Sequence, residues 1–272
     1  MSLKIRLIPV LLYKDGFIVK SQKFNFYQTV GNPFEQVQRY NKWNLDELIY
    51  LNISNNKLIF SSDNNKITGS TSSGKKYIPK KIDVVNFVKK LSSKCFMPLT
   101  YGGGINNINT ARQILKNGAD KISINSYAFK NKKFISECAR YFGSQSIIVS
   151  IDCKKINKDY YVHINDGKTN TNVKVCDWAA EAEKMGAGEI LLNSIDKDGA
   201  MSGFDIRLCQ MVRKVLKIPL IVCGGAANSD DFEYVVKQSN PHSVAAANIF
   251  QFKENSYQLI KKELKKRKLN FR

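Results

Sequence analysis

The amino-acid sequence has no long apolar run, and its first residues do not indicate a secretory leader. Its longest apolar stretch, residues 7–12, has the length of a strand. A membrane helix needs roughly 18 to 20 apolar residues. The first residues lack the small-residue cleavage site of a secretory peptide and continue directly into a strand-like run. We therefore expect neither a membrane-spanning nor a secreted protein.

Cysteine and histidine offer no pattern for a metal site. The six cysteines stand singly without a CxxC pair, and the only histidines are His163 and His242. Structural zinc sites need paired cysteines or histidines at short spacing. We therefore expect no metal, and no motif indicates an organic cofactor. Scattered, unpaired cysteines suit a reducing compartment, which predicts a cytoplasmic protein.

Acidic residues are scarce relative to basic ones. Lys and Arg number 43 against 23 Asp and Glu, which gives a formal charge of +20. Such a charge suits an anionic partner, such as a nucleic acid or a phosphorylated small molecule, or it reflects a lysine-rich surface. Most of the basic residues are lysines and the sequence contains no nucleic-acid-binding motif, so a lysine-rich surface is favoured. The basic run at 261–272 is interpreted as a solvated helix face and end.

Strand-sized apolar runs alternate with helix-sized amphipathic segments along the chain. Eight strands are expected, at residues 5–12, 47–53, 97–101, 121–124, 146–151, 189–193, 219–223 and 243–247. Helical patterns lie between most of them, at 34–41, 82–91, 109–117, 132–141, 175–185, 206–215 and 230–238. Alternating strands and helices form parallel α/β sheets. Eight such units in 272 residues favour a closed (β/α)8 TIM barrel over an open sheet.

The two halves of the chain repeat each other, which strengthens the barrel prediction. Glu47 recurs 142 residues later, and Gly103 recurs 121 residues later. The chain is therefore expected to be a single domain, residues 1–272, built from two duplicated half-barrels of four βα units each. The shortening of the offset after the second strand predicts an inserted loop at 55–76. That loop would lie on the C-terminal face, where such barrels build their active sites.

Paired glycines follow the third and seventh expected strands. Glycine lets backbone N–H groups converge on an anion without a Cβ in the way, although tight packing alone is the structural alternative. Together with the ends of the fourth and eighth strands, these glycines predict two related anion sites at the barrel mouth. The first consists of Gly103, Gly104, Asn125 and Ser126, and the second of Gly224, Gly225, Ala247 and Asn248. Two such sites suit a ligand with a phosphate at each end.

Acidic side chains also fall at strand ends. Asp152 ends the fifth expected strand, where partial shielding would raise its pKa and suit it to acid–base chemistry. A capping role in the following turn is the alternative. After the sixth strand, Asp198 and Gly199 are expected in a ligand-binding turn. Lys20, after the first strand, is a candidate to neutralise a phosphate.

Four charged residues begin barrel strands. Strand starts meet at the N-terminal face, so two acids and two bases there would form an ion-paired ring. The four are Arg6, Glu47, Lys121 and Glu189. Such a ring would close the barrel floor or gate entry from below. From the residues alone, stabilisation of the floor is the favoured interpretation.

The chain closely resembles the HisF family, the cyclase barrels of imidazole glycerol phosphate synthase, over nearly its whole length apart from the insertion. The matching stretches are YGGGI at 101–105, GADKISIN at 118–125, FGSQ at 142–145, GAGEILL at 186–192, SIDKDG at 194–199 and SGFD at 202–205. The resemblance implies a lyase-type barrel subunit of a glutamine amidotransferase, with a HisH-like glutaminase docked on its N-terminal face. Ammonia then passes through the barrel to a substrate with two phosphates. The resemblance also makes the charged ring an ammonia gate.

One departure from the family pattern concerns the reaction itself. HisF uses two aspartates as acid–base groups, at the ends of the first and fifth strands. The second matches Asp152, but the first matches Leu12. Loss of a general acid or base typically costs ~10² to 10⁴ in rate. The family Asp on strand two matches Asn52 and the family Thr on strand six matches Asn193, so the reactive part of the mouth differs from the family pattern.

The stretches IPVLL at 8–12 and CFMPL at 95–99 are similar to amidation-associated, WbuZ-type HisF homologues of surface-polysaccharide gene clusters. That resemblance implies a glutaminase and a barrel that supply ammonia to a separate sugar amidotransferase, which forms acetamidino groups on nucleotide sugars. We favour this ammonia-conducting role. The alternatives are a true cyclase of histidine biosynthesis and a non-catalytic activator or scaffold of the glutaminase.

Overall fold

The computed structural model describes residues 4–54, 59–60, 80–81, 84–252 and 254–272. Most of the insertion predicted at 55–76 lies outside the described residues, and its place on the C-terminal face stays a prediction. The short strand β5 (Ile59–Phe60), inside that range, pairs with β6 (Lys80–Lys81), which follows it.

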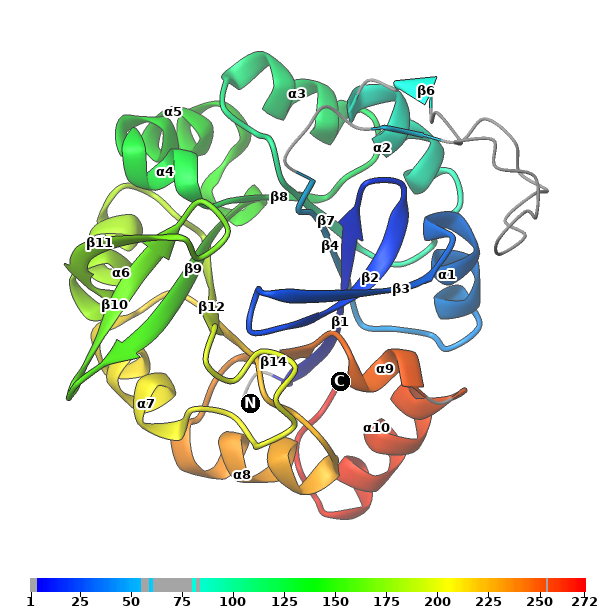
Figure 1. Cartoon of the computed structure of the whole chain (residues 1–272), viewed down its shortest axis with the longest axis vertical. Coiled ribbons are helices and arrows are strands. Elements are labelled where there is room, and N and C mark those ends of the chain that lie inside the picture. Colours follow the sequence, from blue (N-terminus) through cyan, green and yellow to red (C-terminus); the bar gives the residue numbers. More distant parts are fainter. Residues whose placement is uncertain (1–3, 55–58, 61–79, 82–83, 253) are drawn as a thin grey trace.

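Eight parallel strands close into a barrel, which confirms the predicted (β/α)8 architecture (Figure 1). The barrel strands are β1 (Arg6–Lys14), β4 (Leu48–Asn52), β7 (Leu99–Gly102), β8 (Lys121–Ile124), β9 (Ile147–Ile156), β12 (Glu189–Ser194), β13 (Leu220–Cys223) and β14 (Ser243–Ala246). The first strand closes the ring, because β1 pairs with β14 through Arg6 and Ser243 and with β4 through Val10 and Ile49. Closure leaves the barrel strands without an open edge.

Amphipathic helices cover the outside of the barrel. They are α1 (Pro33–Asn41), α2 (Val84–Ser92), α3 (Ile108–Lys116), α4 (Ser126–Lys130), α5 (Lys133–Phe142), α6 (Val175–Lys184), α7 (Ile206–Val215), α8 (Ser229–Ser239), α9 (Ile249–Phe252) and α10 (Ser256–Lys266). Side-chain caps begin some of them, including α1, where Asn32 accepts from the Phe34 N–H, and α8, where Asn228 and Asp231 form a capping box. In the described part of the chain, no helix is long and apolar enough to cross a membrane.

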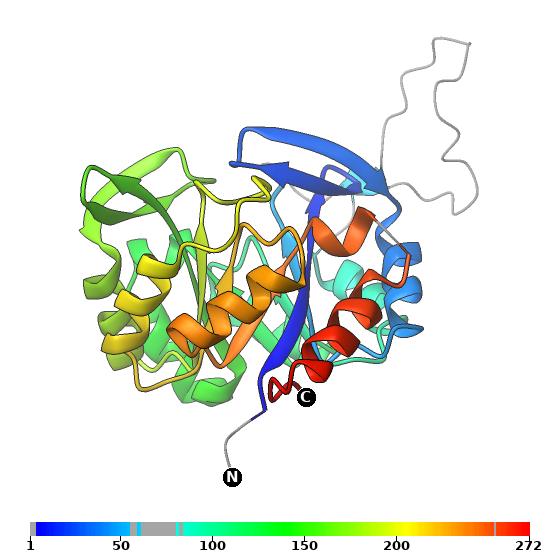
Figure 2. The same ribbon diagram turned by 90° about the horizontal axis from the view of Figure 1, so that it is seen from below.

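Two β-hairpins rise from the barrel on the C-terminal face, and the strand prediction missed both (Figure 2). The first is β2 (Phe17–Gln22) with β3 (Phe26–Gly31), and the second is β10 (Asp159–Ile164) with β11 (Thr169–Lys174). They follow the first and fifth barrel strands, so they repeat the two-fold relation of the halves. The dipeptides Asp15-Gly16, in the turn between β1 and β2, and Asp166-Gly167, in the turn between β10 and β11, are typical hairpin signals. These signals could have located the return of the chain into β2 and the second hairpin from the sequence.

Alternate residues of each barrel strand face inward, and most of them are apolar or small. In β1 the inward row runs from Arg6 through Ile8 and Val10 to Leu12. Ile8, Val10 and Leu12 belong to an apolar cluster inside the barrel that also contains Ile49, Ile148, Leu191, Ile221 and Ala245. The opposite rows pack against the helices in a second, larger cluster. The inward rows therefore run from charged groups at one end of the barrel to the mouth at the other.

Candidate functional site

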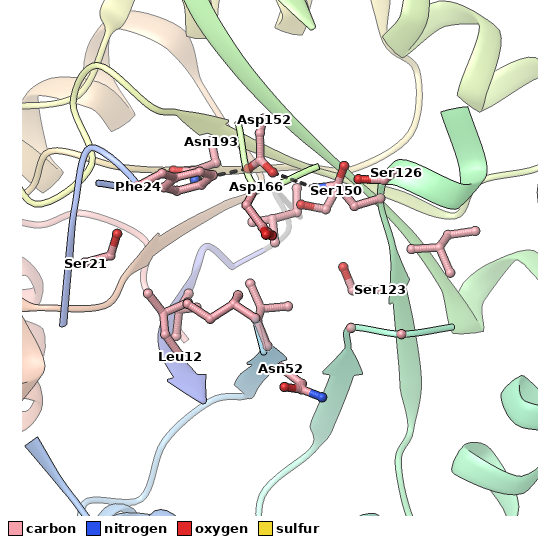
Figure 3. Close-up of a pocket in the computed structure, with 18 of the residues that line it drawn as sticks. Leu12, Ser21, Phe24, Asn52, Ser123, Ser126, Ser150, Asp152, Asp166 and Asn193 are labelled. Atoms are coloured by element: carbon pink, nitrogen blue, oxygen red, sulfur yellow. Dashed lines mark hydrogen bonds between the residues drawn. The ribbon is translucent and has the colours of Figure 1, made fainter. Parts of the chain in front are cut away.

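A cavity of about 390 Å³ lies at the C-terminal end of the barrel, and one side of its wall is more polar than the other (Figure 3). One side carries polar residues of or next to β8, β9 and β12, namely Ser123, Asn125, Ser126, Ser150, Asp152 and Asn193. The other side, of or next to β1 and β4, is more apolar, with Val10, Leu12, Leu51 and Ile53, but it also carries the polar Asn52. Such a cavity suits a ligand with several polar groups and some apolar surface.

Asp152 is held in the cavity wall by two amide donors. Asn125 Nδ2 donates to its Oδ2 at 2.6 Å, and Asn193 Nδ2 donates to its Oδ1 at 3.2 Å. Burial raises the pKa of Asp152 to about 6, although the two amide donors oppose that shift. The nearby charges of Asp198 and Asp166 raise it further. The carboxyl group can therefore give up or take a proton near neutral pH, as general acid–base catalysis requires.

Leu12 occupies the position in the first half-barrel that Asp152 occupies in the second. Across the sheet, Asp152 pairs with Asn193, whereas Leu12 pairs with Leu51. Leu12 is only 8% exposed and packs in the apolar cluster inside the barrel. Figure 3 shows the two side chains on opposite sides of the cavity. The mouth thus has one acidic and one apolar member at its two equivalent strand ends.

The raised pKa of Asp152 predicts a specific dependence of stability on pH. Because the folded-state pKa lies above the ordinary 3.8, the native state binds the proton more tightly. The wild-type free energy of unfolding should therefore fall as pH rises from about 4 to 6. Asp152→Asn lacks this titration. Relative to wild type, it should gain about 2 kcal/mol between pH 4.5 and pH 8. Urea unfolding of both proteins at the two pH values measures this difference. A constant difference would contradict the raised pKa.

The first predicted anion site opens onto the cavity. Gly103, Gly104, Asn125 and Ser126 all line it, together with Lys130. Gly103 and Gly104 have φ angles of +106° and +71°, in the region that favours glycine. Their surroundings differ, since a Cβ on Gly103 would lie 2.1 Å from the Asn52 carbonyl oxygen, whereas a Cβ on Gly104 would meet nothing within 4 Å. Gly103 is therefore required for packing, and Gly104 leaves open space beside the cavity.

These two glycines provide a matched pair of variants. Gly103→Ala forces a Cβ into the backbone of Asn52 and should lower the free energy of unfolding by about 3 kcal/mol or more. Gly104→Ala meets only the backbone strain of a positive φ and should cost about 1 kcal/mol. Urea denaturation compares the two. If both variants lose the same free energy of unfolding, backbone strain, and not the contact with Asn52, explains why position 103 needs glycine.

The second predicted anion site is not brought together in the same way. Of its predicted residues, Ala247 lines the cavity, whereas Gly224, Gly225 and Asn248 do not; of the predicted ligand-binding turn, Asp198 lines the cavity and Gly199 does not. The second glycine pair is closely packed, since a Cβ on Gly225 would lie 2.2 Å from the Gly203 carbonyl oxygen. The two anion sites, although related in sequence, therefore differ in how far they are open to the cavity.

Ser21 of the first hairpin closes this corner of the mouth. Its hydroxyl donates to Asp198 Oδ2 at 2.6 Å, and its carbonyl oxygen accepts from Asn248 Nδ2 at 2.8 Å. A Cβ on Gly199 would lie 2.1 Å from the same carbonyl oxygen. Burial raises the pKa of Asp198, while the Ser21 hydrogen bond opposes the rise. The β2–β3 hairpin thus lies over the second site and is held there by polar contacts.

Asp166 lines the cavity, whereas Lys20, a candidate from the sequence, does not. Lys20, the predicted phosphate ligand, alternates along β2 with the buried Val19 and Ser21 and does not line the cavity. Asp166, which no strand-end motif in the sequence indicates, lines the cavity from the turn between β10 and β11 (Figure 3). Its neighbour Asn165 donates its N–H to Ser126 Oγ at 2.9 Å. The second hairpin thereby places a carboxylate beside the first anion site.

The four predicted gate residues form a closed ring of ion pairs at the other end of the barrel. Arg6 contacts Glu47 at 2.7 Å and Glu189 at 2.6 Å. Lys121 contacts Glu189 at 2.5 Å and Glu47 at 3.7 Å. The side chains are only 9–19% exposed. Burial opposes ionisation of Glu189, but the hydrogen bonds and charges of Arg6 and Lys121 outweigh it and lower its pKa. The ring crosses the floor of the barrel, opposite the cavity.

Comparison with known proteins gives one consistent result. A family described as histidine biosynthesis protein matches residues 77–256. The imidazole glycerol phosphate synthase subunit HisF of Hydrogenobaculum sp. (strain Y04AAS1) is 39% identical over 268 residues, which cover 98% of each chain. The HisF of Bacillus cereus (strain G9842) is 39% identical over 96% of this chain and 95% of its own. That of Sulfolobus acidocaldarius is 40% identical over 90% of this chain and 89% of its own.

Proposed function

The chain belongs to the HisF family of histidine-biosynthesis barrels, and on this basis we propose that it conducts ammonia from a HisH-like glutaminase through its barrel. The glutaminase docks on the N-terminal face, and ammonia enters through the ring of Arg6, Glu47, Lys121 and Glu189. The acceptor is a nucleotide sugar that a separate amidotransferase converts to its acetamidino form, in the cytoplasm.

The observation that carries this proposal is Leu12 in the position equivalent to Asp152. A cyclase mouth with two acid–base groups needs a proton carrier at each of the two strand ends. Here the first end is apolar, because Leu12 packs with Val10 and Leu51 in the cavity wall. The ion-paired ring at the opposite end is complete. A complete ion-paired ring, combined with a mouth that keeps only one of the two acid–base groups, suits a barrel that conducts ammonia better than one that consumes ammonia in a cyclase reaction.

A true cyclase of histidine biosynthesis is the second candidate, and two observations favour it. Asp152 is poised near neutral pH between two amide donors. The relatives that match over most of their length are named HisF subunits of imidazole glycerol phosphate synthase. In this candidate, Asp152 and a water would share the proton transfers that two aspartates perform elsewhere in the family.

One assay separates the two candidates. The purified chain is supplied with the bisphosphate substrate of the HisF cyclases and an ammonium salt at alkaline pH, so that no glutaminase is needed. We expect no formation of imidazole glycerol phosphate. Mixing with the glutaminase should instead raise glutamine hydrolysis and feed a sugar amidotransferase. Rapid turnover by the native chain alone would overturn the amidation role and establish the cyclase. An unchanged glutaminase rate would argue against any functional pairing.

A further inference from the structure

Three pairs of neighbouring barrel strands, β1 with β4, β7 with β8 and β13 with β14, carry the same kind of hydrogen bond near their N-terminal ends. In each pair, a side chain just before the second strand accepts a backbone N–H near the start of the first. We call such a bond a brace. The acceptors and donors are Asp46 and Leu7 (3.1 Å), Asp120 and Leu99 (2.8 Å), and His242 and Leu220 (3.1 Å). The third brace therefore uses the imidazole Nδ1 where the other two use a carboxylate oxygen.

An imidazole brace differs from a carboxylate brace in its response to pH. Nδ1 of His242 accepts the Leu220 N–H only while it carries no proton, so the neutral ring holds its single proton on Nε2. When the ring takes up a second proton from solvent, both nitrogens become donors and the hydrogen bond to Leu220 is lost. A carboxylate remains an acceptor over the same range of pH. The brace between β13 and β14 is therefore the one of the three that mild acid releases.

The backbone of His242 connects this brace to the gate. Its N–H donates to the Leu220 carbonyl oxygen at 3.1 Å, and its carbonyl oxygen accepts the Arg6 N–H at 3.4 Å. The next residue, Ser243, pairs in register with Arg6. Among the described residues, the buried Ser243 hydroxyl has no hydrogen-bond partner, so it does not hold the segment in place of the brace. A shift of His242 therefore reaches the backbone of the residue whose guanidinium binds Glu189 in the gate.

Charged groups from three other elements act on the His242 ring. They are Arg213 of α7, Arg6 of β1 and Glu189 of β12. Arg213 is fixed beside the loop, because its Nε donates to the Asn240 carbonyl oxygen at 3.2 Å and its Nη1 donates to the Leu216 carbonyl oxygen at 2.9 Å. Burial lowers the pKa of His242, and the two guanidinium groups lower it further, whereas the charge of Glu189 opposes them. The neutral ring, and with it the brace, therefore dominates at neutral pH.

We propose that His242 is a positioning residue of the gate and makes the gate sensitive to pH. Protonation of the ring releases the brace between β13 and β14, and the imidazolium then competes with Arg6 for Glu189. The four ion pairs of the ring are closed while His242 is neutral and loosen when it is charged. The inference rests on the proposed function, because it takes this ring as the entrance for ammonia. It adds that mild acid uncouples glutamine hydrolysis from delivery of ammonia to the mouth.

Proton and nitrogen NMR of the whole chain, without a partner, tests the brace. As the His242 ring takes up its proton between about pH 7.5 and pH 5.5, exchange of the Leu220 amide should accelerate about 10-fold after correction for the intrinsic effect of pH, as expected for the loss of one hydrogen bond. The guanidinium resonances of Arg6 should shift with the same midpoint. The Leu99 amide is the matched control, because Asp120 holds it in the equivalent brace, and its corrected exchange should not change.

Two variants separate protonation from a merely structural role of the side chain. His242→Asn offers a side-chain oxygen that accepts at every pH, so the Leu220 amide and the Arg6 resonances should stay as in the neutral wild type. His242→Leu offers no acceptor, and both signals should resemble the acidic wild type at every pH. Circular dichroism and thermal melting of each variant confirm that the fold is retained.

The complex with the HisH-like glutaminase and the sugar amidotransferase supplies the functional measurement. Ammonia lost to solution for each glutamate formed should rise about threefold or more from pH 7.5 to pH 5.5, because the protonated fraction of a histidine rises steeply over this range. His242→Asn, assayed at the same pH values, should remove the rise. If the Leu220 and Arg6 signals do not follow the titration of His242, or if the loss of ammonia is the same at both pH values, the inference is wrong and the proposed function stands. If the complex delivers no ammonia at either pH, both are wrong.

Discussion

Leu12→Asp should raise the turnover of imidazole glycerol phosphate formation by about 100-fold or more over the native chain, as expected when a general acid or base is restored. The substitution places a carboxyl group at the strand end equivalent to that of Asp152, across the cavity from it. The first anion site, with Gly103, Gly104 and Ser126 at the cavity wall, is retained for the substrate. The assay is turnover with the bisphosphate substrate and an ammonium salt at alkaline pH.

Two controls distinguish proton transfer from a change of polarity. Leu12→Asn has nearly the shape of the aspartate variant but cannot carry the proton, and it should stay inactive. Adding Asp152→Asn to Leu12→Asp should remove the gained activity. The aspartate variant should also lose about 2 kcal/mol of stability, because it introduces a carboxyl group among Val10 and Leu51. An asparagine variant as active as the aspartate variant would disprove the acid–base interpretation.

Glu189→Gln should break the gate ring at its most heavily paired member. Glu189 bonds both Arg6 and Lys121, and its side chain is only 9% exposed. Removing its charge leaves two cations against Glu47 alone. Loss of one partner from such a poorly exposed network should lower the free energy of unfolding by about 3 kcal/mol. Urea denaturation at neutral pH measures this loss.

A matched surface variant and a transfer assay complete the test of the gate. Glu233 also contacts two cations, Lys237 and Arg267, but at the surface. Glu233→Gln should therefore have a much smaller effect on stability. With the glutaminase present, Glu189→Gln should release more ammonia into solution for each glutamate formed than Glu233→Gln does. Equal release from both variants would show that the ring only closes the barrel floor.

The mouth and the gate together define how this chain departs from its own internal symmetry. At the mouth, Asp152 faces polar partners while Leu12 faces apolar ones, and only the first anion site lies wholly at the cavity wall. At the gate, the first half contributes Arg6, Glu47 and Lys121, and the second half contributes Glu189 alone. The two halves are thus unequal at both ends of the barrel: most of the gate and the open anion site come from the first half, and the poised acid comes from the second.

The sequence by itself determined the barrel, its two-fold repeat and the positions of most chemical groups. Strand and helix periods are local properties of the chain, and eight alternating units leave few ways to bury both faces of every strand. The repeat also aligned Leu12 with Asp152, and the register of the barrel strands agrees with that alignment. For the same reason, four charged residues at strand starts could be expected to meet at one end.

Only the tertiary structure decided which of these groups share a cavity and which are covered. Ser21 reaches Asp198 across 177 residues of sequence, and this contact depends on how a hairpin folds over the mouth. Asp166 enters the cavity for the same reason, whereas the alternation along β2 turns Lys20 away from it. Contacts between distant segments depend on packing and hydrogen bonds that no local period encodes.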